Sequence, residues 1–257
     1  MRTKFLFLIQ ILLFTPLTTQ AQTMKVMSYN IRYDNPNDGE NKWDNRKDAI
    51  VNLIRYYQPD FIGVQEALLH QLNYIEDNLP HLDSTKFDLI SHNTFWLSES
   101  SDVGSIGWDA AITRVCTYGI FRAKIDSTEI AVFNTHFDHK GRTARLRSAE
   151  LILEKIDNLT HDSTKIILTG DFNSLPDSLP IQTLSTVLDD GAAISQTGLY
   201  GPIGTFNWFD KDAELKARID YIFTKNVIVH SYRHIDDRRP NNYWVADHLP
   251  VFVEMGY

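Results

Sequence analysis

Apolar residues along the chain fall into short runs separated by polar segments. Three longer segments instead repeat apolar residues every three or four positions, which indicates amphipathic helices. Helices are therefore expected from Asp44, as the capping residue, to about Tyr57, over about 68–78 and over about 144–159, with a short fourth helix after Pro180. The strand-like runs are about 24–31, 60–65, 93–97, 109–116, 119–125, 129–135, 165–170, 219–224, 227–234 and 250–255.

The order of these elements predicts an α/β fold. The runs at 119–125 and 129–135 are separated by a few polar residues, as in an antiparallel hairpin, whereas other strands are joined through helices, as in parallel pairs. This mixture favours two packed mixed sheets with helices outside, an α/β sandwich whose site lies at one rim of the sheets.

Polar residues follow several strand-like runs. Asp171 and Asn173 are two positions apart at the end of the run Lys165–Thr169, so both can face one pocket above the sheet edge. Other runs end in the same way, and a single site could collect Asn30, Glu66, His136, Asp171, Asn173, Asp220, Asp247 and His248.

Several acids in one pocket require a counter-charge. Two carboxylates about 4 Å apart at an effective dielectric of ~20 repel by roughly 4 kcal/mol, so converging acids need a cation or an imidazolium. Oxygen ligands favour Mg²⁺, Mn²⁺ or Ca²⁺ over zinc. The usual zinc signal His-Glu-x-x-His is absent, and Cys116 is the only cysteine, expected to be a buried small hydrophobe.

The first residues read as a targeting segment. Arg2 and Lys4 precede an apolar run over 5–14, and small residues allow cleavage after Ala21, so residues 1–21 are expected to be a signal peptide and 22–257 a single domain. The alternative is an uncleaved anchor, although the run is too short to span a bilayer and no transmembrane segment is expected. A secreted or periplasmic location follows.

The charge balance disfavours one class of partner. The chain has 25 basic and 33 acidic residues, so removing Arg2 and Lys4 takes the net charge from −8 to −10 (23 minus 33). Proteins that grip long duplex DNA by counterion release usually present a basic face, and none is visible here. The balance favours small or locally recognised substrates and lowers the expectation of a nonspecific nuclease.

The ordered motifs closely resemble those of the endonuclease/exonuclease/phosphatase family. Longer matches, such as Gly107–Ala111 and Thr135–His139, look like its secreted and periplasmic branch frequent in Bacteroidetes. The resemblance implies a four-layer α/β sandwich that hydrolyses phosphomonoesters or phosphodiesters with Mg²⁺ or Mn²⁺, by in-line attack of an activated water. The motifs are Tyr29-Asn30, Gln65-Glu66, Asn134-Thr-His136, Gly170-Asp-Phe-Asn173, Ile219-Asp220-Tyr221 and Asp247-His248.

The resemblance also implies roles for these residues. Glu66, with Asn30 and Asp247, would bind the metal, and Asp171 would orient and deprotonate the attacking water. Asn173 would be a neutral donor to water or phosphate. Asp220 would hold His248 in the required tautomer and raise its pKa. His136 would contact the phosphate or serve as an acid, and which histidine protonates the leaving group is left open.

Candidate substrate contacts lie in the loops. Arg32 and Arg145 could bind phosphate oxygens, and Trp208 could stack on a base or sugar. The alternative for Trp208, as for Trp43, is a partly buried packing role.

One departure from the family pattern changes the expectation. About two dozen residues have no counterpart after about residue 81, so two strands and a loop arginine are expected to be missing. A glutamate that pairs with the histidine matching His136 is also missing, unless Asp83 or Asp88 replaces it. A natural truncation, a deletion in the sequence and closure by neighbouring strands all remain open, and an exposed sheet edge is expected.

The functional expectations follow in order. The first is a phosphoesterase, expected to be monomeric, that acts on a small molecule or a nucleic acid. The second is a nuclease of the DNase or RNase type. The third is a phosphate-ligand binding protein that kept the metal site but lost turnover with the missing segment.

Overall fold

Two mixed β-sheets pack against each other and carry helices on their outer faces. This computed structural model describes residues 22–79 and 85–257. The first sheet has the order β2 (Phe61–Gln65), β1 (Thr23–Asn30), β11 (Val251–Gly256), β10 (Ile228–His234), β8 (Leu199–Tyr200). The second has the order β3 (Phe87–Trp96), β4 (Val115–Ala123), β5 (Glu129–His136), β6 (Lys165–Asp171), β9 (Asp220–Lys225), β7 (Asp189–Asp190).

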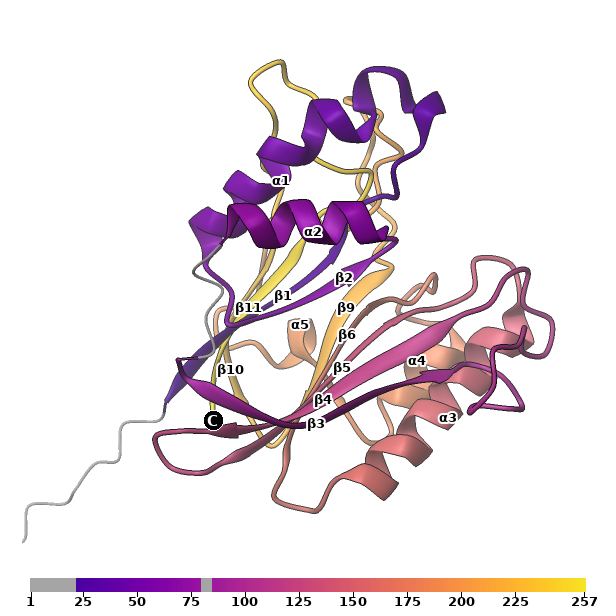
Figure 1. Cartoon of the computed structure of the whole chain (residues 1–257), viewed down its shortest axis with the longest axis vertical. Coiled ribbons are helices and arrows are strands. Elements are labelled where there is room, and N and C mark those ends of the chain that lie inside the picture. The colour runs from indigo at the N-terminus through magenta and orange to yellow at the C-terminus, as the bar shows by residue number, and fades with distance from the viewer. Residues whose placement is uncertain (1–21, 80–84) are drawn as a thin grey trace, which may run out of the picture.

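The helices complete the layers (Figure 1). Helices α1 and α2 lie against the first sheet, and α3 and α4 lie against the second. Their bounds are Trp43–Tyr57 for α1, Leu69–Asn78 for α2, Arg142–Leu159 for α3 and Leu179–Leu184 for α4, with a short α5 at Gly191–Ile194 and a 3₁₀ helix at Pro36–Asn41. The predicted α/β sandwich of two mixed sheets flanked by helices is confirmed.

Three hydrophobic clusters hold the layers together. Val26 and Ile167 belong to a cluster shared by the two sheets, Ile50 and Ile54 of α1 pack on the first sheet, and Ile152 and Ile156 of α3 pack on the second. Burial of such side chains contributes roughly 1.5–3 kcal/mol each. Cys116 is fully buried, as expected, and so is nearly all of Trp43, which therefore has a packing role.

The expected strand over 109–116 is wrong in most of its length. Residues up to Arg114 form a loop, and β4 begins only at Val115. The reason is a set of hydrogen bonds to carboxylates: the backbone N–H groups of Ala111 and Ile112 donate to Asp138, at 3.1 and 3.4 Å. Backbone groups satisfied in this way do not need a neighbouring strand.

The expected cap of the first helix is also wrong. Lys42 occupies the capping position without a side-chain hydrogen bond, and Asp44 lies in the first turn, where it pairs with Lys47 at 2.9 Å. An acid in the first turn still interacts favourably with the helix dipole.

The strand β3 forms an edge of the second sheet. Its middle residues are exposed, with Leu89 at 53% and Ile90 at 48%, so an unpaired strand edge faces solvent in the described part of the chain. The expected gap after about residue 81, together with Asp83, lies outside the described residues. Asp88 sits 3.4 Å from Lys124, at the end of β3 away from His136, so it does not replace the missing glutamate.

The expected signal peptide, residues 1–21, also lies outside the described residues. No helix in 22–79 and 85–257 is long and apolar enough to cross a bilayer.

A buried histidine makes stability depend on pH. His234 is fully buried, its Nδ1 lies 2.7 Å from the carbonyl of Pro202, and burial lowers its pKa from 6.5 to about 4. The unfolded chain binds the proton more readily, so this contribution is complete above pH 6.5 and is lost as the pH falls toward 4.

We therefore expect His234→Asn to lose part of the acid sensitivity. The wild type should lose on the order of 3 kcal/mol more than the variant between neutral pH and about pH 4, measured by urea unfolding at a series of pH values. Asparagine keeps a donor for the Pro202 carbonyl. Parallel pH profiles for the two proteins would contradict a buried neutral imidazole.

Candidate active site

Strand pairing brings the predicted residues to one rim of the sheets. In the parallel pair β5–β6, His136 is opposite Asp171, and in the antiparallel pair β6–β9, Asp171 is opposite Asp220. On the facing sheet Asn30 ends β1 and is opposite Gln65 at the end of β2, directly before Glu66. The carboxyl ends of four strands and the start of β9 therefore meet at one place.

Asp171 is the centre of the resulting cluster. Its Oδ2 lies 3.0 Å from the amide nitrogen of Asn30, 3.2 Å from Nε2 of His136 and 3.7 Å from Nε2 of His248, while Oδ1 accepts a hydrogen bond of 2.9 Å from the backbone N–H of Asn173. The side chain is 2% exposed. A buried carboxylate is tolerated here because donors surround it.

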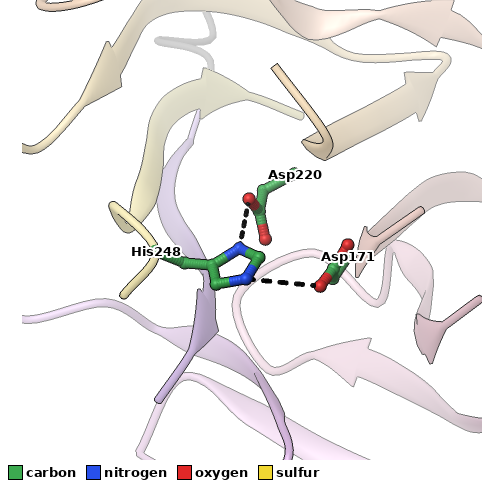
Figure 2. Close-up of side chains that lie close together, drawn as sticks. All are labelled: Asp171, Asp220 and His248. Atoms are coloured by element: carbon green, nitrogen blue, oxygen red, sulfur yellow. Dashed lines mark hydrogen bonds and ion pairs between the residues drawn. The ribbon is translucent and has the colours of Figure 1, made fainter. Parts of the chain in front are cut away.

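His248 lies between two carboxylates (Figure 2). Its Nδ1 is 2.8 Å from Oδ2 of Asp220, and its other ring nitrogen points toward Asp171. Burial alone lowers the pKa of His248, but the charges of Asp220 and Asp171 outweigh it and raise the pKa to about 10. The Thr205 hydroxyl donates to the same Asp220 oxygen at 2.6 Å, which fixes the carboxylate. The imidazole is therefore a cation at neutral pH.

His136 has the opposite electrostatic balance. Burial lowers its pKa to about 4, although Asp171 opposes the shift. Its Nε2 lies 3.0 Å from the amide nitrogen of Asn173, which also donates to the carbonyl of Phe137 at 3.0 Å. His136 is therefore a neutral imidazole placed beside the same carboxylate as the charged His248.

A second acidic group lies on the other side of Asn30. The Asn30 amide donates to Glu66 at 3.3 Å as well as to Asp171, so it links the two groups. Asp247 is 5% exposed, burial raises its pKa, and the charge of Glu66 raises it further. Its Oδ1 is buried and has no hydrogen-bond partner among the described residues. An orphaned buried carboxylate oxygen beside a second acid fits a divalent cation.

A different trio could also hold a metal ion. One ligand atom each from Asp171, Asp220 and His248 lie within 4.8 Å of one another. However, both nitrogens of His248 already face carboxylates and its raised pKa keeps it protonated, so it supplies the positive charge itself. Glu66 and Asp247, helped by Asn30, therefore fit a metal better than this trio does.

The loops that carry the site have unusual backbone angles. Arg32, Glu66, Asn173 and Trp208 all have positive φ, at 59°, 62°, 46° and 56°. Left-handed conformations are uncommon for residues other than glycine and cost of order 1 kcal/mol or more each. The first three directly follow β1, β2 and β6, so the chain turns sharply as it leaves each strand at the rim.

The three predicted substrate contacts lie in different surroundings. Arg32 forms a fork with Asp38, at 3.0 and 3.2 Å, and lies 3.8 Å from Asp247. Arg145 donates to the main-chain carbonyl of Asp138 at 2.9 Å, which ties it to the loop after β5. Trp208 is 78% exposed and its ring centroid is 4.8 Å from that of Phe206, which in turn contacts His248. It is therefore not a core residue.

Sequence reasoning missed Arg114. Its Nε is buried, makes no hydrogen bond with the described residues and lies 3.8 Å from Asp138. Burial lowers the pKa of Arg114, and the charges of Asp138, Asp171 and Glu66 oppose that shift, so the guanidinium is near the cluster. The available signal was its position directly before β4, whose start is paired with the end of β5.

A family model matches residues 27–248 and is described as the Endonuclease/Exonuclease/phosphatase family. The chain belongs to this family. The match spans every strand that supplies a residue to the cluster, from Asn30 to His248. An α/β sandwich and a phosphoesterase class follow from membership, and the family's dependence on divalent metals agrees with the acids at the rim.

Individual relatives add detail. The mannosyl-6-phosphatase Bt3783 of Bacteroides thetaiotaomicron is 33% identical, with a TM-score of 0.86 over 91% of this chain and 100% of that chain. The uncharacterized protein L388 of Acanthamoeba polyphaga mimivirus is 31% identical over 82% of this chain and 91% of that protein. A probable RNA exonuclease of Saccharomyces cerevisiae is 28% identical over 65% of this chain, which spans 41% of that protein's length.

We expect Asp220→Asn to lower the pKa of His248 by about 2 units, because the variant loses the closer of the two carboxylate charges. The asparagine side chain is nearly the same size, so the fold should survive. Titration of the imidazole proton resonances by NMR measures the change. An unaltered His248 titration in the folded variant would show that Asp220 is not the source of the raised pKa.

Proposed function

We propose that this protein is a divalent-metal-dependent phosphatase that hydrolyses a phosphomonoester of a small polar molecule. The carrying observation is the Asp171 carboxylate, which lies within 4 Å of Asn30, His136 and His248 beside the orphaned acid Asp247. Similarity to a mannosyl-6-phosphatase over its whole length supports a sugar phosphate as the substrate class. The acidic net charge of −8 supports a small substrate over a long polyanion.

The side chains divide the work by charge. Asp171 accepts the proton of the attacking water, and the Asn30 amide orients its carboxylate. The cationic His248, held by Asp220, donates a hydrogen bond to the phosphoryl oxygens as negative charge develops on them. Asn173 offers a neutral amide, which adds a donor without repelling the phosphate. Arg114 is a further positive charge for the substrate.

Asn30, Glu66 and Asp247 would hold the divalent ion, whose charge offsets that of the phosphate. Carboxylate and amide oxygens suit Mg²⁺ or Mn²⁺.

The exposed Trp208 favours a second candidate function. An aromatic face next to the catalytic imidazole can stack on a nucleobase, and one relative is a probable RNA exonuclease. A phosphodiesterase acting on short single-stranded RNA is therefore the alternative.

We also propose that the chain is exported to the periplasm or secreted, because basic residues and an apolar run precede Ala21. Sequencing of the exported protein should give Gln22 as its first residue. Export with Met1 intact would contradict cleavage.

Replacing the central carboxylate should remove turnover. We expect Asp171→Asn to lower kcat on a hexose 6-phosphate by on the order of 10²–10⁴-fold, because the amide cannot accept the proton of water. The exposed Asp177→Asn, six residues further along, is the matched control and should keep full activity. The same panel includes bis-p-nitrophenyl phosphate and a short RNA with and without Mg²⁺. Preferred turnover of RNA would favour the exonuclease, and undiminished activity of Asp171→Asn would refute its role.

Removing a carboxylate beside Asn30 should weaken metal binding. We expect Glu66→Gln and Asp247→Asn each to raise the Mg²⁺ concentration for half-maximal activity by about 10–100-fold, since each loses a charged oxygen ligand. Direct Mn²⁺ binding, measured by calorimetry, should weaken in parallel. If instead only Asp220→Asn weakened Mn²⁺ binding, the trio of Asp171, Asp220 and His248 would be the metal site.

A further inference from the structure

A second cavity lies on the outer face of the first sheet. It has a volume of about 580 Å³, and its lining includes the end of α1 and parts of β1, β10 and β11. Lys25 lies near the start of β1, and Asn30 of the active site ends the same strand, five residues or about 16 Å away. Lys25 also alternates with residues that face the other sheet. We call this cavity the tyrosine groove, and it is separate from the active site.

Two exposed aromatic rings line the tyrosine groove. Tyr56 at the end of α1 is 79% exposed, and Tyr200 of β8 is 69% exposed. The guanidinium of Arg233 lies between two rings, 5.4 Å from the centroid of Tyr200 and 5.5 Å from that of Tyr57. Cation–π contacts of this kind hold the side chains in place. The groove therefore presents large apolar faces to water on a fixed frame.

The polar groups of the groove are balanced in charge. Lys25 and Glu254 are opposite each other on β1 and β11, with Nζ 3.8 Å from Oε1, and Ser231 is opposite Glu254 on β10. Arg233 is paired with Asp237 at 3.5 Å. Each positive charge thus has a partner acid, so the groove lacks the cationic excess that phosphates and nucleic acids require.

This combination selects a class of ligand. A pyranose ring has an apolar C–H face, which packs on an aromatic ring, and a rim of hydroxyl groups that both donate and accept hydrogen bonds. The tyrosine rings fit the face, and the ammonium, carboxylate and hydroxyl groups of Lys25, Glu254 and Ser231 fit the rim. We propose that the tyrosine groove binds a neutral hexose unit of a glycan, apart from the site of phosphate hydrolysis.

The groove would hold a carbohydrate chain close to the enzyme without taking part in the reaction. Binding there does not depend on a metal ion or on Asp171. It therefore stands whether the catalytic site is a phosphatase or an exonuclease.

The test is a binding measurement on the full chain with two neutral probes, a mannose trisaccharide and a glucose trisaccharide. Saturation-transfer NMR and calorimetry should show saturable binding of at least one probe at concentrations up to about 10 mM. The double variant Tyr56→Ala/Tyr200→Ala should weaken this binding at least about tenfold, since it removes both stacking faces. Both side chains are exposed, so the variant should fold, and its phosphoester hydrolysis should be unchanged.

Ile125→Ala is the matched control. Ile125 is 67% exposed in the turn between β4 and β5, outside the groove, and its replacement should leave sugar binding intact. Three results would overturn the proposal: no saturable binding of either sugar, equal binding by the double variant, or competition of the bound sugar by inorganic phosphate, which would place it in the active site. Preferential binding of a short oligonucleotide to the groove would also overturn it.

Discussion

Three carboxylates, of Asp171, Asp220 and Asp247, are buried within one rim of the sheets, and their mutual repulsion is the constraint on which the site depends. Each is balanced by a different device. Asp220 accepts from Thr205 and faces His248, and Asp171 is surrounded by an amide, a backbone N–H and two imidazoles. Asp247 has only Arg32 at 3.8 Å, and that arginine already forms a fork with Asp38. The remaining need for positive charge is therefore greatest at Asp247, next to Glu66.

Backbone strain at the rim serves the same arrangement. Arg32, Glu66 and Asn173 adopt left-handed angles directly after their strands, and the packed sheets beneath supply the free energy that maintains them. A strand that ended gradually would carry its last side chains away from the rim. The sharp turns instead return the Asn173 N–H to the Asp171 carboxylate at 2.9 Å, and the Tyr33 N–H to Glu66 at 3.2 Å. Local strain is thus coupled directly to the orientation of the two acids.

Much of the fold and the site could be predicted because strand periodicity is a local property. Asp171 and Asn173 follow an apolar run, and alternation alone places polar groups at its end. The pairing of β6 with β9, which brings Asp220 to Asp171, joins residues about fifty positions apart, and only the family resemblance indicated it. The loop before β4 was read as a strand because its backbone partners are the distant Asp138. Arg114 was missed for the same reason, since its neighbours are set by that loop.

The two histidines show how one residue type can take two roles at a single carboxylate. His136 and His248 are both buried beside Asp171, so desolvation disfavours the charged form of each. His248 also faces Asp220, whereas His136 has Arg114 and the cationic His248 nearby, and the pKa values separate to about 10 and about 4. The family pattern would provide His136 with a glutamate, and in the described chain Asp88 is too far along β3 to replace it. Without a second acid His136 stays neutral, so the protonated group available to the phosphate and its leaving oxygen is His248.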